Sequence, residues 1–508
     1  MSIIEAQVHQ TLLQLSRQLQ GDHWQHHLTL ARLVTRGLRL HRSALIQTHT
    51  GVGDYALSYL TPALLSTDAV VIVTPPDLQQ WLAETEIPRL QTLLQTDRQV
   101  IRAENYPAQP TGVILITPDL WLAAMLGDRL FPSVTTILNP VDDLWQWVQN
   151  HLKATLTTHD WDSLKQQNPA QQAFIQDRYN QLKENLLRRS PNPYHCHVLQ
   201  TADLACLTDC LQLSEQPTPW QKYHQRLHSA DNNPLCWATL NRRTGLFSIQ
   251  AIPQNFAAQL ESLWQRQPTL FIGGFLDAEK EAPTFREQIG LTDADLTCVN
   301  FTPPRLQHQT QVYLPERHLS LPNTPEFQGQ ILPQLQKLVR LSRNTPHPVV
   351  LMINDVPLQA QMGAALAAEF GSCVKVEQPD LQTDSILICG WNFWRSLTNP
   401  LFYGQPLNFP LPQLMAIATL PLPSLENPLV AGRVAHYKQK RQDWFRLYLL
   451  PTALREIQRA IYPLHQDHSL VAILDNRINH RAYGKQILDA LQPCSVCNYL
   501  DPSWFGYW

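Results

Sequence analysis

Two glycines, Gly51 and Gly53, follow Thr50 in a short segment that could bend tightly around a phosphate group. A working phosphate loop needs such glycines together with a lysine that meets the phosphates and a Ser or Thr hydroxyl that binds magnesium. Here Asp54 stands at the lysine position and Tyr55 at the hydroxyl position. The spacing therefore indicates either a degenerate phosphate loop or a plain structural turn.

A phosphate loop must be held between a strand and a helix, and the surrounding pattern supplies both. Short apolar runs at 44–46, 69–73, 112–116 and 134–138 predict strands, and helical patterns lie between them. Such alternation predicts a parallel sheet with helices on both faces. A second alternating series begins at 349–353. We therefore expect an α/β fold with two parallel-sheet lobes.

The predicted domain boundaries follow from changes in composition. The stretch 145–231 is rich in Gln, Lys and Arg and lacks apolar strand runs, which predicts a helical insertion in the first lobe. A length of 508 residues favours several domains. The predicted parts are N-terminal helices at 1–43, a first lobe at 44–144 and 232–300, the helical insertion at 145–231, and a second lobe at 301–508 after the joint Pro303-Pro304.

Further motifs recur in order along nearly the whole chain. After the glycine segment come 71–75, the Gly-Trp-Asn-Phe-Trp stretch that opens 390–400, the Leu-Pro-Leu-Pro stretch that opens 420–428, and 448–484. In this order they resemble the DinG/XPD-type superfamily 2 DNA helicases. The resemblance implies two RecA-like lobes of the P-loop NTPase fold, which face each other across a nucleotide cleft. It also implies an arch-like insertion and single-stranded nucleic acid running over both lobes.

Placed on the motifs of that family, this chain lacks the catalytic groups. Asn139 and Pro140 fall on the acidic DEAH box, and Thr398 falls on the final Asp of the EGxD motif. Tyr462 and His465 fall on the two arginines that stabilise the transferred phosphoryl group. We therefore expect no intact catalytic residue. The chain is interpreted as a non-hydrolysing helicase scaffold that binds single-stranded DNA or RNA, or a protein partner.

Three charged residues lie close to the missing groups. Asp142 and Asp143 come three and four residues after the DEAH position and are expected to be solvated charges at a helix start. Arg459 precedes the first arginine position by three residues and could substitute only if the backbone shifts. Two alternatives stay open. One is an active ATP-dependent DNA helicase with replacement groups, and the other is a regulatory scaffold without nucleic-acid binding.

Electrostatics opposes nucleotide binding at the degenerate loop. Each charge pair at ~4 Å is worth about 1 kcal/mol in water and about 4 kcal/mol at a surface-like dielectric. Replacing lysine by Asp54 removes such attractions and adds repulsions against several phosphate charges. This cost could outweigh a typical micromolar affinity of about 8 kcal/mol.

No cofactor is expected, and ATP with magnesium belongs only to the active-helicase alternative. Many relatives hold an iron–sulfur cluster on four cysteines in the first lobe, but this chain has no cysteine before Cys196. Cys206 and Cys210 are spaced by one helical turn, and Cys494 and Cys497 form a lone CxxC. Such pairs are more often structural than metal-binding, so no metal site is predicted.

Net charge gives no bulk attraction to any class of partner. The chain has 39 Lys and Arg against 42 Asp and Glu, a net charge of -3. Nucleic-acid contacts must therefore come from local clusters, and aromatic side chains beside cations suit single-strand stacking. Nine scattered cysteines and the polar residues after Met1 predict a reduced, cytoplasmic protein, and without an apolar run of about 20 residues we expect no membrane contact. The candidate nucleic-acid residues are Arg433, Lys438, Lys440, Arg441 and Trp394, beside weaker candidates that include Arg188 and Arg189.

Overall fold

A computed structural model describes most of the chain, and its contacts divide the chain into two compact units. Unit 1 comprises Met1–Leu144, Glu261–Leu422 and Leu450–Trp508, and unit 2 comprises Trp145–Leu260 and Pro423–Leu449. The predicted joint at Pro303-Pro304 lies outside the described residues. The described residues are 3–19, 24–127, 129, 133–228, 234–255, 257–291, 296–301, 310–315, 319–322, 324–343, 345–466 and 469–505.

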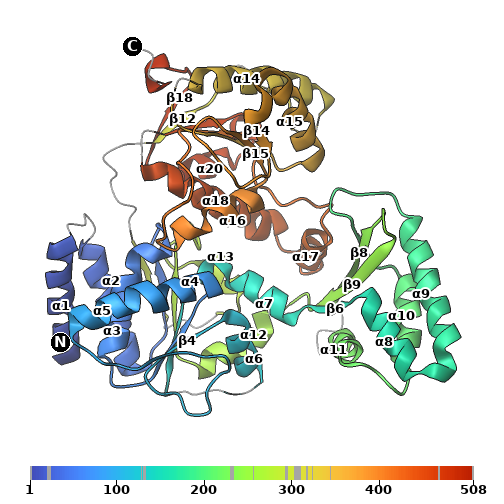
Figure 1. Cartoon of the computed structure of the whole chain (residues 1–508), viewed down its shortest axis with the longest axis horizontal. Coiled ribbons are helices and arrows are strands. Elements are labelled where there is room, and N and C mark those ends of the chain that lie inside the picture. The colour runs from blue at the N-terminus through green and yellow to red at the C-terminus, as the bar shows by residue number, and fades with distance from the viewer. Residues whose placement is uncertain are drawn as a thin grey trace. The chain divides into compact units, whose positions relative to one another are not determined.

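Unit 1 contains a first parallel sheet, built from seven strands of the described residues (Figure 1). Its central strands are mostly apolar and fully buried, because helices cover both faces of a parallel sheet. The strand order is β11 (Thr297–Asn300), β1 (Ala44–Gln47), β10 (Thr269–Gly273), β5 (Thr135–Leu138), β2 (Val70–Val73), β4 (Val113–Ile116) and β3 (Val100–Arg102). Its helices are α1 (Ile3–Leu19), α2 (Trp24–Leu40), α3 (Ala56–Leu65), α4 (Pro76–Trp81), α5 (Ile87–Leu94), α6 (Pro118–Leu126) and α13 (Pro283–Gln288).

A second parallel sheet, also of seven strands in the described part of the chain, belongs to unit 1 as well. The predicted class, α/β with two parallel-sheet lobes, is confirmed. The strand order is β14 (Val374–Val376), β15 (Ile386–Cys389), β13 (Val349–Met352), β16 (Leu414–Ile417), β17 (Leu470–Ile473), β12 (Thr310–Tyr313) and β18 (Cys494–Cys497). Its helices include α14 (Pro325–Ser342), α15 (Val356–Phe370), α16 (Trp391–Phe402), α18 (Leu450–Ile461), α19 (Arg477–His480) and α20 (Gly484–Ala490).

Unit 2 combines helices with a small antiparallel sheet. Figure 1 shows α8, α9 and α10 on one side of the sheet and α17 on the other, where Leu429 packs against Leu235 and Trp237. The strand order is β6 (Ala154–Leu156), β9 (Leu246–Ile252), β8 (Leu235–Asn241) and β7 (Cys196–Val198). The helices include α8 (Thr158–Gln167), α9 (Gln172–Leu187), α10 (Thr201–Leu211), α11 (Thr218–Leu227) and α17 (Pro428–Gln439).

This arrangement differs from the predicted helical insertion in two ways. The stretch 145–231 contains strands β6 and β7, which pair with β9 and β8 from the stretch predicted to belong to the first lobe. The segment Pro423–Leu449, predicted to belong to the second lobe, also packs in unit 2. The strands β6 and β7 have three residues each and become stable only by pairing with distant strands, so local periodicity does not reveal them.

Among the described residues, no helix combines the length and the apolar character that crossing a lipid bilayer requires.

Candidate nucleotide site

The glycine segment leaves the first sheet at the carboxyl end of β1. The backbone N–H groups of Thr48 and His49 donate to the carbonyls of Gly273 and Gly274, each at 2.9 Å. His49 has a left-handed φ of 55°, which turns the chain toward Thr50. A short 3-10 helix, Val52–Tyr55, then leads into α3. The predicted strand, turn and helix are therefore present.

Tyr462, which follows α18 of the second lobe, lies directly against this segment. Its hydroxyl donates a hydrogen bond of 2.9 Å to Oδ2 of Asp54. A Cβ added to Gly51 would lie 2.6 Å from the same hydroxyl oxygen. Burial, and next the adjacent Asp54 carboxylate, raise the pKa of Tyr462 well above its ordinary value. Tyr462 is therefore a neutral donor that occupies the space in front of Gly51.

The backbone of the second lobe covers the second glycine of the segment. A Cβ added to Gly53 would lie 2.2 Å from the backbone nitrogen of Gly404 and equally close to the carbonyl carbon of Tyr403. Phe402 belongs to the same buried apolar cluster as Tyr403, Tyr462 and Val52. Phosphate oxygens need open backbone N–H groups around the loop. Protein atoms fill that space, so the loop in this conformation does not fit the phosphate chain of a nucleotide.

Tyr55, at the magnesium-hydroxyl position, is turned into the protein interior. Its ring is 2% exposed and lies 4.8 Å from the His27 ring and 5.8 Å from the Phe301 ring. Its hydroxyl lies 3.4 Å from Nδ1 of His26. Burial raises the pKa of Tyr55, so the phenol stays protonated. Tyr55 thus contributes to the core beneath α2 and offers no ligand to a metal beside Asp54.

Asp142 and Asp143, predicted to be solvated, are instead engaged by the protein. The Asp142 carboxylate accepts hydrogen bonds from the backbone N–H groups of Gly274 at 2.9 Å and Phe275 at 2.7 Å. Asp143 is only 8% exposed and pairs with two arginines of the second lobe. The sequence interpretation is wrong here because it rested on the position of each acid before α7 (Leu144–Leu152). The arginines that pair with Asp143 lie 252 and 316 residues away in the sequence, and no local pattern predicts those contacts.

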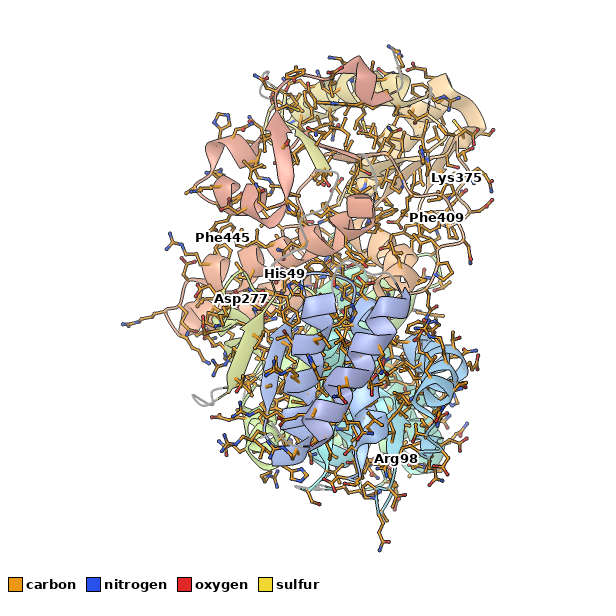
Figure 2. The ribbon with its side chains drawn as sticks, turned by 90° about the vertical axis from the view of Figure 1, so that its left-hand side faces the viewer. His49, Arg98, Asp277, Lys375, Phe409 and Phe445 are labelled. Carbon is orange, nitrogen blue, oxygen red and sulfur yellow. The ribbon has the colours of Figure 1, made fainter. Side chains whose placement is uncertain are left out.

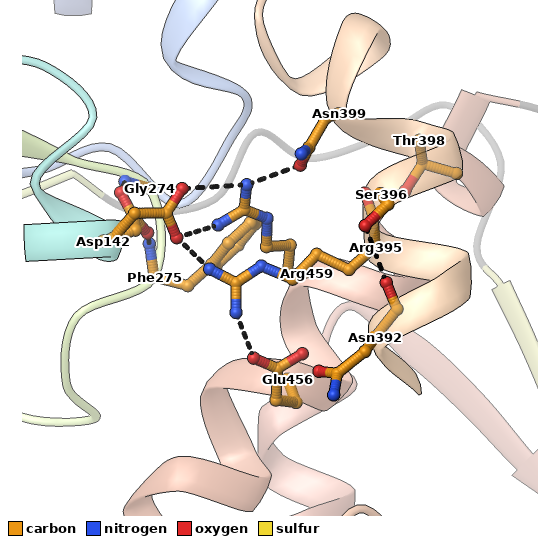
Figure 3. Close-up of polar contacts among 11 residues, drawn as sticks. Asp142, Gly274, Phe275, Asn392, Arg395, Ser396, Thr398, Asn399, Glu456 and Arg459 are labelled. Atoms are coloured by element: carbon orange, nitrogen blue, oxygen red, sulfur yellow. Dashed lines mark hydrogen bonds and ion pairs between the residues drawn. The ribbon is translucent and has the colours of Figure 1, made fainter. Parts of the chain in front are cut away.

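Two arginines of the second lobe, Arg395 and Arg459, which Figure 3 labels, pair with Asp143. Nη1 of Arg459 lies 2.9 Å from Oδ1 of Asp143, and Arg395 pairs with the same oxygen. Arg395 also reaches Oε1 of Glu456 at 2.6 Å. Arg459 donates to Oδ1 of Asn399 at 2.8 Å. Both guanidinium groups are therefore neutralised by carboxylates of the chain itself.

Arg459 is also held by an aromatic face. Its guanidinium carbon lies 4.1 Å from the centroid of the Phe402 ring, and the residue is 6% exposed. The guanidinium is fixed by a carboxylate, an amide and a ring together. Sequence reasoning named Arg459 but missed its partner Asp143, and it missed the pairing of Arg395 with Glu456. Glu456 lies on α18 and Arg395 lies on α16, and nothing in the sequence indicates that these two residues meet.

The remaining predicted catalytic positions hold structural residues. Asn139 is fully buried after β5, and its amide lies beside Tyr59. Pro140 follows Asn139 immediately before a 3-10 helix. The Thr398 hydroxyl is buried and donates to the carbonyl of Trp394 at 2.9 Å. His465 belongs to the 3-10 helix Tyr462–Gln466, but its side chain lies outside the described residues.

The nucleic-acid candidates divide into a core residue and surface residues. Trp394 is 0% exposed and its indole N–H donates to the Ala460 carbonyl at 2.9 Å, so the prediction that it contacts nucleic acid is wrong in this structure. An aromatic residue next to a cation has the same sequence pattern whether its ring faces the core or the solvent. The face of α16 on which Trp394 lies determines its environment, and the sequence does not reveal that face. The four candidate cations lie in unit 2: Arg433, stacked between the rings of Trp145 at 3.6 Å and Tyr448 at 4.2 Å, Lys438, over Trp444 at 5.5 Å, and the exposed Lys440 and Arg441.

Metal-binding groups do not gather in the part of the chain that the structure describes. There, no three side chains of His, Cys, Asp or Glu come close enough to hold one ion. Cys206 and Cys210 are buried thiols of α10, and burial raises the pKa of Cys210 to about 12. Protonated, buried thiols are poor ligands. Cys206 and Cys210, as buried and protonated thiols, do not fit the thiolate ligands of an iron–sulfur cluster.

Comparisons with known proteins agree with the arrangement of the two sheets. The family described as Helicase C-terminal domain matches residues 407–494. The 3'-5' exonuclease DinG of Bacillus subtilis is 25% identical over 243 residues, which cover 44% of this chain and only 25% of the exonuclease. Two solved structures share the fold with a TM-score of 0.60. An apo XPD is 13% identical, covering 92% of this chain and 99% of that one, and S. tokodaii Xpd4 is 11% identical, covering 93% and 100%.

Proposed function

Because the chain is a DinG/XPD-type member of the superfamily 2 helicases with two RecA-like lobes, we propose that it is a non-hydrolysing scaffold that binds single-stranded nucleic acid without ATP. The observation that carries this proposal is the contact between Tyr462 and Asp54, which fills the phosphate loop with groups of the chain itself. The match to the exonuclease spans a quarter of that protein, so no nuclease activity is proposed.

Admitting a nucleotide would require several interactions to be lost at once. Tyr462 would have to leave Gly51 and Asp54, and Tyr403 with Gly404 would have to leave Gly53. The exposed Asp54 carboxylate would then face the phosphates, at a cost of about 1 to 4 kcal/mol for each charge pair near 4 Å. A working phosphate loop has a lysine that attracts the phosphates, and here no lysine offsets the repulsion from Asp54. These opposing terms favour a loop that stays closed.

The arginines near the loop are committed to another task. Arg459 and Arg395 would have to leave Asp143 before either could meet a phosphoryl group. Breaking a buried ion pair by removing one partner typically costs about 3–5 kcal/mol, because the other charge stays buried and unpaired. Their position near the degenerate loop therefore supports a structural role that links the two lobes rather than transition-state stabilisation.

Nucleic-acid binding is assigned to cations outside the loop. Lys438, Lys440 and Arg441 follow one another at the end of α17, and Lys438 lies over the Trp444 ring. A phosphate-directed cation beside a partly exposed aromatic is a combination that binds single strands without sequence preference. With so few clustered charges we expect modest affinity and a handful of phosphate contacts.

The test is a binding titration of the full chain with a fluorescent single strand of about 20 nucleotides at low salt. We expect the affinity for the strand to be unchanged by Mg-ATP. We also expect that a fluorescent ATP analogue does not bind. Binding of the strand that strengthens or weakens with ATP would favour the active helicase. No binding of the strand would contradict the nucleic-acid function and favour a scaffold for a protein partner.

A further inference from the structure

The two units of the chain carry opposite charge. Unit 2 has 15 Lys and Arg against 10 Asp and Glu, a net charge of +5. Unit 1 has 24 Lys and Arg against 32 Asp and Glu, a net charge of -8. The near-neutral charge of the whole chain therefore hides a basic unit and an acidic unit. A polyanion is attracted to the first and repelled by the second.

The acidic charge of unit 1 is placed where a ligand of a parallel sheet would bind. Asp54, Asp77 and Asp119 follow the carboxyl ends of β1, β2 and β4, and all three are exposed. Asp277 follows the carboxyl end of β10. The carboxyl ends of parallel strands meet at one edge of the sheet, which is the usual place for a ligand. Phosphates would meet carboxylates at this edge of the first lobe.

Five cations meet on the surface of unit 2, at the end of α9 and the turn between β8 and β9. We call Lys183, Arg188, Arg189, Arg242 and Arg243 the basic patch. Arg242 donates from Nη1 to the Leu187 carbonyl at 3.1 Å and from Nη2 to the Arg189 carbonyl. A Cβ added to Gly245, in the turn, would lie 3.2 Å from Nζ of Lys183. The turn and the helix end therefore form one surface.

The patch combines a cation that other residues hold in place with cations that are exposed. Arg189 is held by the buried Asp203 and donates to the Val198 carbonyl at 2.7 Å. Arg188 and Arg243 are exposed. Arg188 has one carboxylate partner, Glu184, and within the described residues no ion pair neutralises Arg243. Burial first, and then Arg189 and Arg242, lower the pKa of the neighbouring His197, as expected for a positive local potential.

We propose that the basic patch of unit 2 binds the phosphate backbone of single-stranded nucleic acid, so that the strand is carried by unit 2 and not across the two sheets. This inference rests on the proposed nucleic-acid function and places its binding surface. Four of the five cations are arginines, whose planar guanidinium groups match phosphate geometry. Tyr194, 36% exposed on the segment between Arg189 and β7, offers an exposed ring for stacking.

The experiment compares two double charge reversals in the full chain. Arg188→Glu with Arg243→Glu changes two exposed cations of the patch. Lys337→Glu with Lys485→Glu changes two exposed cations of unit 1 and alters the net charge by the same amount. Each protein is titrated with a fluorescent oligothymidylate of about 20 nucleotides over a range of salt, and thermal unfolding confirms that each variant folds. Polyglutamate is used as a competitor.

We expect the patch variant to bind at least about tenfold more weakly at low salt, with a salt slope reduced by about 1.4, because single strands lose about 0.7 per phosphate contact. The unit 1 variant should bind within about twofold of the unchanged chain, since its two changed charges are not part of the patch. Polyglutamate should compete poorly.

Four results would overturn the inference. Equal weakening by both variants would assign the effect to bulk charge, and unchanged binding by the patch variant would place the strand elsewhere while the nucleic-acid function stands. Polyglutamate that competes as well as the oligonucleotide would point to an acidic protein partner. If the unchanged chain does not bind the strand at all, the proposed function fails together with the inference.

Discussion

The Tyr462 hydroxyl donates to the Asp54 carboxylate across 2.9 Å, and this single contact joins two positions that the sequence predicts to be degenerate. In the helicases that the sequence resembles, these positions hold an arginine and a lysine, which repel each other unless phosphate lies between them. Here a neutral donor meets an anionic acceptor. The two residues therefore satisfy each other without any ligand, and the loop is stable in its filled form.

Removing the Tyr462 hydroxyl tests this relationship. The variant Tyr462→Phe keeps the buried ring but loses the hydrogen bond to Asp54, and we expect a loss of about 1 kcal/mol in the free energy of unfolding. Urea unfolding measures it. Tyr499→Phe, on a residue that is 61% exposed, serves as the control and should change little. A Tyr462→Phe protein as stable as its parent would show that the contact does not hold the loop.

Breaking the ion pairs of Asp143 should lower the free energy of unfolding more than breaking an exposed ion pair does. Asp143→Asn leaves Arg459 buried beside Arg395 without a compensating charge, and we expect a loss of about 3 kcal/mol in unfolding free energy. Asp380→Asn breaks a pair whose carboxylate is 80% exposed and should cost less than about 1 kcal/mol.

A double-mutant cycle separates the pair from other effects of the substitutions. Asp143→Asn combined with Arg459→Met should cost less than the two single changes added together, because the second change removes the charge that the first leaves unpaired. Simple additivity would contradict a direct coupling between Asp143 and Arg459.

Parts of this arrangement were predictable from sequence and parts were not. Runs such as Val70–Val73 predict buried parallel strands because four apolar residues in a row suit a sheet covered on both faces. The turn and helix that follow the first strand were also predictable. The contact from Asp54 to Tyr462 crosses 408 positions and depends on how two lobes pack, which no local pattern encodes. The paired role of Asp143 was missed for the same reason.

His49 gives the fold a dependence on pH. It is the left-handed residue of the glycine segment (Figure 2), and burial lowers its pKa, with Asn300 and Asp142 opposing the shift. The unfolded chain, with a histidine pKa of about 6.5, therefore takes up the proton first as the pH falls. The stabilising contribution is complete above about pH 6.5 and declines below it.

The variant His49→Asn tests this dependence, because asparagine tolerates a left-handed φ and does not titrate. Between about pH 7.5 and pH 5.5 the unchanged chain should lose up to about 1 kcal/mol more unfolding free energy than the variant. His228→Asn, at the exposed end of α11, should keep the parental pH profile. Parallel profiles for His49→Asn and the parent would contradict the assignment.

The cluster at the end of α17 should add to nucleic-acid binding. Reversing Lys438, Lys440 and Arg441 to Glu removes three phosphate-directed charges from unit 2. We expect weaker binding of a single strand and a salt slope lowered by up to about 2, at about 0.7 per phosphate contact. Fluorescence anisotropy over a salt series measures both. A reduced affinity with an unchanged salt slope would show that these residues do not contact phosphates.

Phosphate release from Mg-ATP by the purified chain, with and without single-stranded DNA, tests the central claim most directly. We predict no release above a no-protein control, and the same result for Asp54→Lys, because Asn139, Thr398 and Tyr462 still replace the other catalytic groups. DNA-stimulated release that disappears when Arg459 is changed to Ala would contradict the account. It would establish instead an active helicase in which Arg459 has taken over a catalytic role.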